Sequence, residues 1–164
     1  MITIEEFMTP EPYTLRETDS LNDARKIMTE KHIRHIPIID NDNDNHVLGL
    51  VTQRDVLAAT EPGFKVQTKG ISCELDIKLA DIMIRNVSVI HREDSLRQAA
   101  LYIQSHKYGC LPVVSDDRLV GIITDSDFID IAINLLEQAE IMEEEASIEI
   151  ETDTTLLGSG TARV

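Results

Sequence analysis

The sequence of 164 residues predicts an α+β fold made of two copies of one β-α-β-β-α unit. The chain matches itself when it is shifted by 75 positions, which aligns Asp19-Ser20-Leu21 with Asp94-Ser95-Leu96 and Pro37 with Pro112. After the turn that follows residue 40, an offset of 72 aligns the rest of the two copies. Because self-similarity at a fixed spacing indicates a repeated structural unit, the two segments should fold alike.

Each copy contains the same elements in the same order. A short extended piece precedes a helix whose N-cap is Ser20 or Ser95, since a serine oxygen accepts a backbone N–H that the first turn leaves without a partner. Apolar residues at helical spacing follow each serine. An Asp/Asn-rich turn then joins two β-rich runs, as in a hairpin. A second helix begins after Thr52 or Thr124. The predicted extended segments are 13–15, 36–39 and 47–51 in the first copy, and 88–90, 111–114 and 119–123 in the second.

We divide the chain into a first repeat at 1–60, a linker at 61–78, a second repeat at 79–135, and an extended helix with an acidic tail at 136–164. The linker contains Pro62, Gly63 and Gly70 and has weak periodicity. One copy of about 50 residues buries too little surface to be stable alone, so the copies should pack as one globule. Apolar residues extend the last helix to Met142, and the chain beyond Glu143 should be mobile.

Charge and composition restrict the partners. The net charge of −15 argues against nucleic acid polymers and anionic membranes, and eight of the acidic residues lie between Glu137 and Asp153. No apolar run approaches the roughly 20 residues of a membrane helix, and the acidic N-terminus is unlike a signal peptide. Cys73 and Cys110 have no zinc-ligand spacing, which favours reduced thiols in the cytoplasm.

One motif recurs where the last strand of each copy leads into the second helix. It is Gly-h-h-Thr-x-x-Asp, where h is apolar, at residues 49–55 and 121–127. Glycine permits close approach to the backbone, a helix N-terminus favours phosphate, and an Asp accepts hydrogen bonds from ribose hydroxyls. Thr-x-x-Asp is also close to a capping box, in which the two side chains cap the helix without a ligand. Both interpretations stay open, because one residue pair can serve both.

The motif is accompanied by the strands His-Ile-Pro-Ile-Ile-Asp at 35–40 and Cys-Leu-Pro-Val-Val-Ser at 110–115, and by the opening Met-Thr-Pro at 8–10. Taken together, residues 1–135 resemble the cystathionine-β-synthase (CBS) domain family. The resemblance implies two copies paired through their sheets into a pseudo-two-fold disk, with adenosyl ligands in two clefts between the copies. The second copy departs from the family's opening, since Met83-Ile84-Arg85 replaces Met-Thr-Pro.

The resemblance also implies which residues bind the ligand. The Thr and Asp of each motif are expected to contact phosphate and ribose, with one pair in each cleft. Residues just before the strand Pro are expected to line the adenine and ribose. The expected ligand is AMP, ADP or ATP, and no cofactor is required. The predicted nucleotide-binding residues are Tyr13, Ile33, Arg34, Ile36, Thr52, Arg54, Asp55, Tyr108, Cys110, Leu111, Thr124 and Asp127.

The residues that flank the two motifs differ in charge. Arg54 follows Thr52, whereas Asp125 and Ser126 follow Thr124. Because Arg forms strong charge-assisted hydrogen bonds with phosphate, the cleft with Thr52 should prefer a phosphorylated ligand. In a pseudo-symmetric pair, however, one copy can lend its basic residues to the other cleft.

The sequence therefore predicts a cytoplasmic, non-enzymatic nucleotide-sensing module that acts on a separate, unknown protein. Two alternatives stay open, a module that binds S-adenosylmethionine and a dimerisation scaffold with empty clefts. We expect a homodimer, with packing of the helix at 128–142. The Asp/Asn run at 40–45 resembles a calcium loop, but Val51 stands where such a loop needs a Glu, so a solvated hairpin is the expectation.

Overall fold

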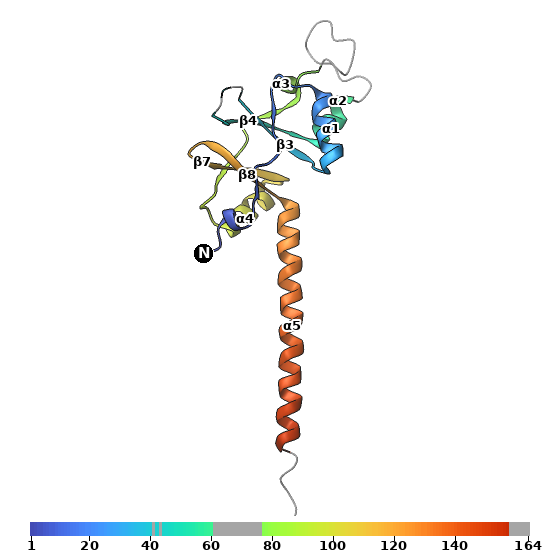
Figure 1. Ribbon diagram of the computed structural model, residues 1–164, viewed down its shortest axis with the longest axis vertical. Helices are drawn as coiled ribbons and strands as arrows, with labels where there is room; N and C mark the ends of the chain where they lie inside the picture. Colours follow the sequence, from blue (N-terminus) through green and yellow to red (C-terminus); the bar gives the residue numbers. More distant parts are fainter. Residues whose placement is uncertain (41, 43, 61–76, 158–164) are drawn as a thin grey trace, which may run out of the picture. The chain divides into compact units, whose positions relative to one another are not determined.

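The computed structural model describes residues 1–40, 42, 44–60 and 77–157 (Figure 1). Most of the predicted linker lies outside these residues, apart from Ile77 and Lys78. Residues 1–125 and 126–164 form two compact units. The elements of the first repeat are η1 (Ile4–Glu6, a 3₁₀ helix), β1 (Thr9–Pro10), β2 (Leu15–Arg16), α1 (Leu21–Lys31), β3 (His35–Ile39), β4 (Val47–Thr52) and α2 (Gln53–Thr60). The elements that follow are α3 (Leu79–Ile82), β5 (Ile84–Arg85), β6 (Ile90–His91), α4 (Leu96–His106), β7 (Cys110–Ser115), β8 (Arg118–Thr124) and α5 (Asp125–Leu157).

Two mixed four-stranded sheets confirm the predicted α+β class, and each sheet takes a strand from the other repeat. The strand orders are β1-β8-β7-β6 and β2-β3-β4-β5. The opening strand β1 pairs antiparallel with β8, with Pro10 opposite Gly121. In the same way β5 pairs with β4, with Arg85 opposite Gly49. The repeats are therefore joined by exchanged strands, which the boundaries drawn from the sequence do not describe.

The glycine of each repeated motif makes room for the exchanged strand. A Cβ placed on Gly49 would come within 2.6 Å of the backbone oxygen of Ile84, and one on Gly121 would meet Met8 and the oxygen of Thr9. The sequence predicted a close approach to the backbone at these positions. In this structure the approaching group is the neighbouring strand, so strand pairing alone explains the glycines.

The two predicted N-caps differ. The Ser20 hydroxyl accepts a hydrogen bond from the Asp23 amide at 3.2 Å, and the Ser20 amide donates to the Asp23 carboxylate at 2.9 Å, so a capping box is formed. The Ser95 side chain makes no cap hydrogen bond, contrary to the prediction. The amide of Leu96 donates to the backbone oxygen of Ile2 at 3.1 Å, and in the first copy the amide of Leu21 donates to that of Ile77 at 2.9 Å, so this contact is common to both copies and does not account for the difference.

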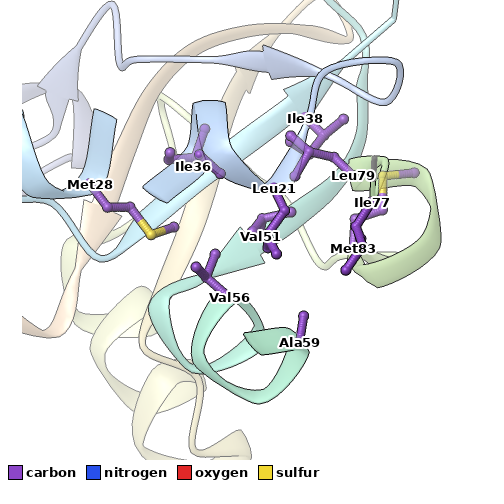
Figure 2. Packing of buried hydrophobic residues seen from close by; sticks show 11 residues of the cluster. Leu21, Met28, Ile36, Ile38, Val51, Val56, Ala59, Ile77, Leu79 and Met83 are labelled. Carbon is purple, nitrogen blue, oxygen red and sulfur yellow. The ribbon is translucent and has the colours of Figure 1, made fainter. Parts of the chain in front are cut away.

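An aliphatic core fills the first repeat, as expected for a chain with 4% aromatic residues (Figure 2). Side chains from α1, β3, β4 and α2 meet there with Ile77 at the end of the linker and with Leu79 and Met83 of the second repeat. A second, smaller cluster joins the two sheets through Leu50 of β4, Cys110 of β7 and Ile122 of β8. Packing across this cluster explains why neither repeat needs to be stable alone.

Helix α5 is longer than the sequence predicted. It continues to Leu157, whereas we expected the helix to end near Met142 and the chain to be mobile beyond Glu143. Five Glu, one Ala and two Leu make up about half of the fifteen residues after Met142 in this helix, and these residue types are strong helix formers, so the acidic composition does not break the helix. Among the residues described, no helix has the length and apolar character needed to cross a bilayer.

Candidate ligand-binding cavity

A cavity of about 900 Å³ lies between the two repeats. The first repeat contributes the junction between β4 and α2, together with Arg34 and His35 at the start of β3. The second repeat contributes the end of α4 and the start of β7, together with the segment that follows the exchanged strand β5. The cavity is therefore a product of the pairing of the repeats and belongs to neither repeat alone.

Thr52 and Asp55 form a complete capping box at the wall of this cavity. The Thr52 amide and hydroxyl both donate to Oδ2 of Asp55, at 2.8 and 2.6 Å, and the Asp55 amide donates to Thr52 Oγ1 at 3.3 Å. The capping interpretation of the motif is thus correct for this copy. Within the described residues Oδ1 of Asp55 makes no hydrogen bond, so the same carboxylate keeps one oxygen available as an acceptor.

Cationic side chains gather around the same cavity. Arg34, Arg54 and Lys107 line it and are exposed. Nη2 of Arg34 lies 3.3 Å from Oδ1 of Asp125, and about half of each of these side chains is exposed, so solvent screens the pair. In the described part of the chain Arg54 forms no ion pair. The cavity thus presents positive charge that internal carboxylates only partly offset.

His35 and Cys110 form a less polar part of the wall. Burial lowers the pKa of His35 below its ordinary value of 6.5 and Arg34 adds to this, against the opposing effects of Asp125 and Asp55. Burial raises the pKa of the Cys110 thiol to about 12, and the nearby Asp125 carboxylate acts in the same direction. Both side chains are therefore neutral at pH 7.

Six of the predicted nucleotide-binding residues line this cavity. They are Arg34, Thr52, Arg54, Asp55, Tyr108 and Cys110. Tyr108 and Cys110 of the second copy thus line the same cavity as Thr52 and Asp55 of the first copy. The two sheets pack against each other through Leu50 of β4 and Cys110 of β7, although Cys110 pairs with Thr124 within its own sheet.

The other six do not line the cavity. Ile36 and Leu111 are almost fully buried, because both side chains point into the sheet interior. Ile33 packs against the core of the first repeat. The Tyr13 ring lies 5.3 Å below Nζ of Lys31. Thr124 and Asp127 are also absent from the lining residues.

Sequence reasoning missed the segment after β5, from which Asn86, Val87 and Ser88 reach the cavity. The repeat itself carried the necessary signal, because Ser88 occupies the position of Tyr13 in the other copy. It also missed the aromatic group beside the cavity, in which Tyr102 stacks on His106 with ring centroids 4.0 Å apart and Tyr108 lies 5.6 Å from His106. Ser88 Oγ and the Tyr102 hydroxyl are 2.9 Å apart, which ties this group to the cavity lining.

The Asp-rich hairpin after β3 makes contacts within the protein. Asp44 forms an ion pair with Arg118 at 3.1 Å, and Nδ1 of His46 lies 2.9 Å from the backbone oxygen of Asp117. Residues 41 and 43 lie outside the described part of the chain. Among the described residues, no group of three or more His, Cys, Asp or Glu side chains is placed to hold a metal ion.

Comparison with known families places both copies in one family. The family model of the CBS domain matches residues 4–61 and again residues 79–134. Among curated proteins, the homoserine O-acetyltransferase of Methanocorpusculum labreanum is 32% identical over 124 residues. The inosine-5'-monophosphate dehydrogenase of Staphylococcus aureus is 30% identical over 117 residues. The chain spans 23% and 21% of the length of these enzymes, so the likeness concerns a part of each.

Solved structures of similar length share the fold. A Vibrio cholerae protein provisionally named acetoin utilization protein AcuB is 46% identical, with a TM-score of 0.72 over 85% of this chain and 96% of that one. CBSX2 of Arabidopsis thaliana, solved with AMP, is 30% identical, with a TM-score of 0.69 over 82% and 98% of the two chains. The CBS domain pair of MJ0100, solved with 5'-methylthioadenosine and S-adenosyl-L-methionine, is 26% identical, with a TM-score of 0.65 over 79% and 98%.

Proposed function

Because this chain belongs to the CBS domain family and carries two copies of the domain, we propose that it is a regulatory module that binds an adenine nucleotide in the cavity. The observation that carries the proposal is the meeting of Thr52 and Asp55 with three cationic side chains in one cavity. Ligand binding would alter the behaviour of a separate partner protein. The AMP complex of CBSX2 supports this ligand class.

Each group of the proposed site has a role that its chemistry allows. Oδ1 of Asp55 accepts a hydrogen bond from a ribose hydroxyl while Oδ2 keeps the helix capped. Arg54 and Arg34 bind phosphate oxygens, since charge-assisted hydrogen bonds are about twice as strong as neutral ones. Tyr108 and Val87 offer apolar surface to the adenine ring. A phosphorylated adenosine is thereby favoured over adenosine itself.

A second ligand class has one observation in its favour. The carboxylates of Asp125 and Asp55 both lie at the cavity, and they suit the positive sulfonium of S-adenosylmethionine. The ligands of MJ0100 belong to this class. Arg54 and Lys107 oppose it, because both add positive charge. A dimerisation scaffold with an empty cavity is the third possibility, and we propose a homodimer in either case.

Calorimetric titration of the purified chain with AMP, ADP, ATP, NAD, adenosine and S-adenosylmethionine tests these proposals. We expect a phosphorylated compound to bind most tightly. Asp55→Asn and Arg54→Ala should each weaken that binding by about ten- to a hundredfold, the effect of losing hydrogen bonds to a charged group. Arg54→Ala should leave adenosine binding unchanged, because adenosine has no phosphate.

Thr124→Val is the matched control, since Thr124 occupies the same place in the other copy and does not line the cavity. It should leave nucleotide affinity in this cavity unchanged. The proposal is wrong if wild type binds none of these compounds. It is also wrong if Arg54→Ala has no effect on ATP binding while Thr124→Val abolishes it.

A further inference from the structure

Helix α5 is a single long helix (Figure 1), and its sequence carries a regular apolar stripe. Six residues recur at alternating spacings of four and three along it, which is the heptad spacing of helices that pack side by side. Leu135 is 60% exposed and Met142 is 68% exposed. We call this set the heptad stripe, and its members are Phe128, Ala132, Leu135, Ala139, Met142 and Ala146.

Large and small side chains alternate along the heptad stripe. Phe128, Leu135 and Met142 are separated by alanines, so Leu135 and Met142 each have a shallow position on either side. A helix with the complementary pattern can insert its own large side chains at the alanines, as knobs enter holes in a coiled coil. From Phe128 to Ala146 the stripe is about 27 Å long, enough for a partner helix of about five turns.

The charge of α5 determines which partner suits the stripe. From Asp125 to Leu157 the helix has eleven acidic residues and no Lys, Arg or His. Glu143 and Glu145 stand directly beside the stripe, at the positions where coiled coils place the charges that select a partner. Two copies of α5 packed side by side would bring together two helices that carry acidic residues and no cation, so they would repel each other. A basic helix would pair with the carboxylates of Glu143 and Glu145.

We propose that the heptad stripe is the docking surface for an amphipathic helix of another protein, with Lys or Arg beside its own apolar stripe. The inference deepens the proposed function, since it gives the chemistry of the regulated partner. The statement that this partner is the regulated protein rests on the proposed function, whereas the contact between the helices does not depend on it. Failure of ligand binding therefore leaves the docking proposal standing, and the reverse also holds.

The test uses the full chain and three synthetic peptides of equal length, labelled for fluorescence anisotropy. The first has Leu at both heptad core positions and Lys at the flanking positions. The second has Glu in place of Lys. The third has the composition of the first in a scrambled order without heptads. We expect the first peptide to bind at least about tenfold more tightly than the other two, with an affinity that falls as salt rises.

Two pairs of variants locate the contact on the helix. Leu135→Ser/Met142→Ser removes two large side chains of the stripe, and Ile133→Ser/Ile141→Ser removes two exposed apolar side chains that lie off it. Glu143→Gln/Glu145→Gln neutralises the flanking acids, and Glu137→Gln/Glu144→Gln neutralises two acids on the opposite face. The first member of each pair should weaken binding of the Lys peptide by at least about tenfold, and the second by less than about threefold.

Three outcomes would overturn the proposal. The first is equal binding of the Lys and scrambled peptides, which would mean that charge alone is responsible. The second is that none of the three peptides binds. The third is self-association of the chain in sedimentation that Leu135→Ser/Met142→Ser abolishes, which would mean that the stripe packs against a second copy. Calorimetry of the same stripe variant with the nucleotides keeps the two proposals distinct, because its ligand affinity should match that of wild type.

Discussion

Gly109 lies against the imidazole ring of His35, and a Cβ at position 109 would come within 2.6 Å of Nε2 of that ring. The contact joins the segment before β7 of the second repeat to β3 of the first, and both residues line the cavity. The shape of this wall therefore depends on the absence of a side chain at one position.

Gly109→Ala should displace the His35 ring into the cavity. We expect nucleotide affinity to fall several-fold and stability to fall by about 1–3 kcal/mol, the usual cost of overpacking. Calorimetry and urea unfolding measure the two effects. The double variant Gly109→Ala/His35→Ala removes the clash. Its loss of stability should therefore be smaller than the sum of the losses in the two single variants. Strict additivity would contradict the contact.

The pKa of His35 predicts a pH dependence. Because burial lowers its pKa in the folded protein below 6.5, the unfolded chain binds more protons as the pH falls through 6.5. The free energy of unfolding should therefore decrease as the pH is lowered from 7.5 toward 5. The decrease due to His35 should stop once the pH lies below the pKa of His35 in the folded protein. His35→Gln should flatten this part of the profile in urea unfolding. An unchanged profile would show that other groups cause it.

A second pH window belongs to a different group. Hydrogen bonds from Ser20 lower the pKa of Asp23 below 3.8 in the folded protein, with lesser help from Lys78 and Lys26. The stability that this carboxylate contributes is present above pH 3.8 and is lost as the pH falls through its folded pKa. Ser20→Ala should lower the stability at pH 7 by about 1 kcal/mol and weaken the acid dependence below pH 4. Ser95→Ala is the control, because the Ser95 side chain makes no cap hydrogen bond.

The motif glycines should differ in their tolerance of a methyl group. Gly49→Ala brings Cβ within 2.6 Å of a backbone oxygen of β5, whereas Gly121→Ala mainly meets the flexible Met8 side chain. We expect Gly49→Ala to cost about 1–3 kcal/mol and Gly121→Ala to cost less. Urea unfolding of the two variants compares them directly. Equal losses would mean that the backbone of β5 shifts freely.

The Cys110 thiol should resist modification. Its pKa of about 12 leaves almost no thiolate at pH 8, and the residue is 3% exposed although it belongs to the cavity wall. In Cys73→Ser protein Cys110 is the remaining cysteine. Folded protein should then react slowly with a disulfide reagent, and addition of urea should release one fast equivalent. Fast reaction without urea would show that the cavity wall opens.

The repeat predicted most of the fold. Period and turn chemistry identified both helices and the central hairpin of each copy, because those segments are long enough to carry a pattern. The exchanged strands were not predicted, because a two-residue strand such as Thr9–Pro10 is too short to show an alternation of apolar and polar residues. The sequence also did not predict that Thr52 and Tyr108 line one cavity, because alignment of the two copies does not say which of their faces meet. The repeat placed the N-cap of the second copy correctly at Ser95, but it did not determine whether the serine side chain makes the cap hydrogen bond, which is absent.

The exchange of β1 and β5 makes the tandem chain the covalent equivalent of a strand-swapped dimer. Pro10 opposite Gly121 and Arg85 opposite Gly49 are the same pairing at corresponding positions of the two copies. In a single repeat the opening strand would leave its sheet edge unpaired, so an isolated repeat should complete its sheet by exchanging this strand with a second copy. Gene duplication of such a unit yields this architecture without any new contact. Separating the halves should therefore give chains that reassociate in trans.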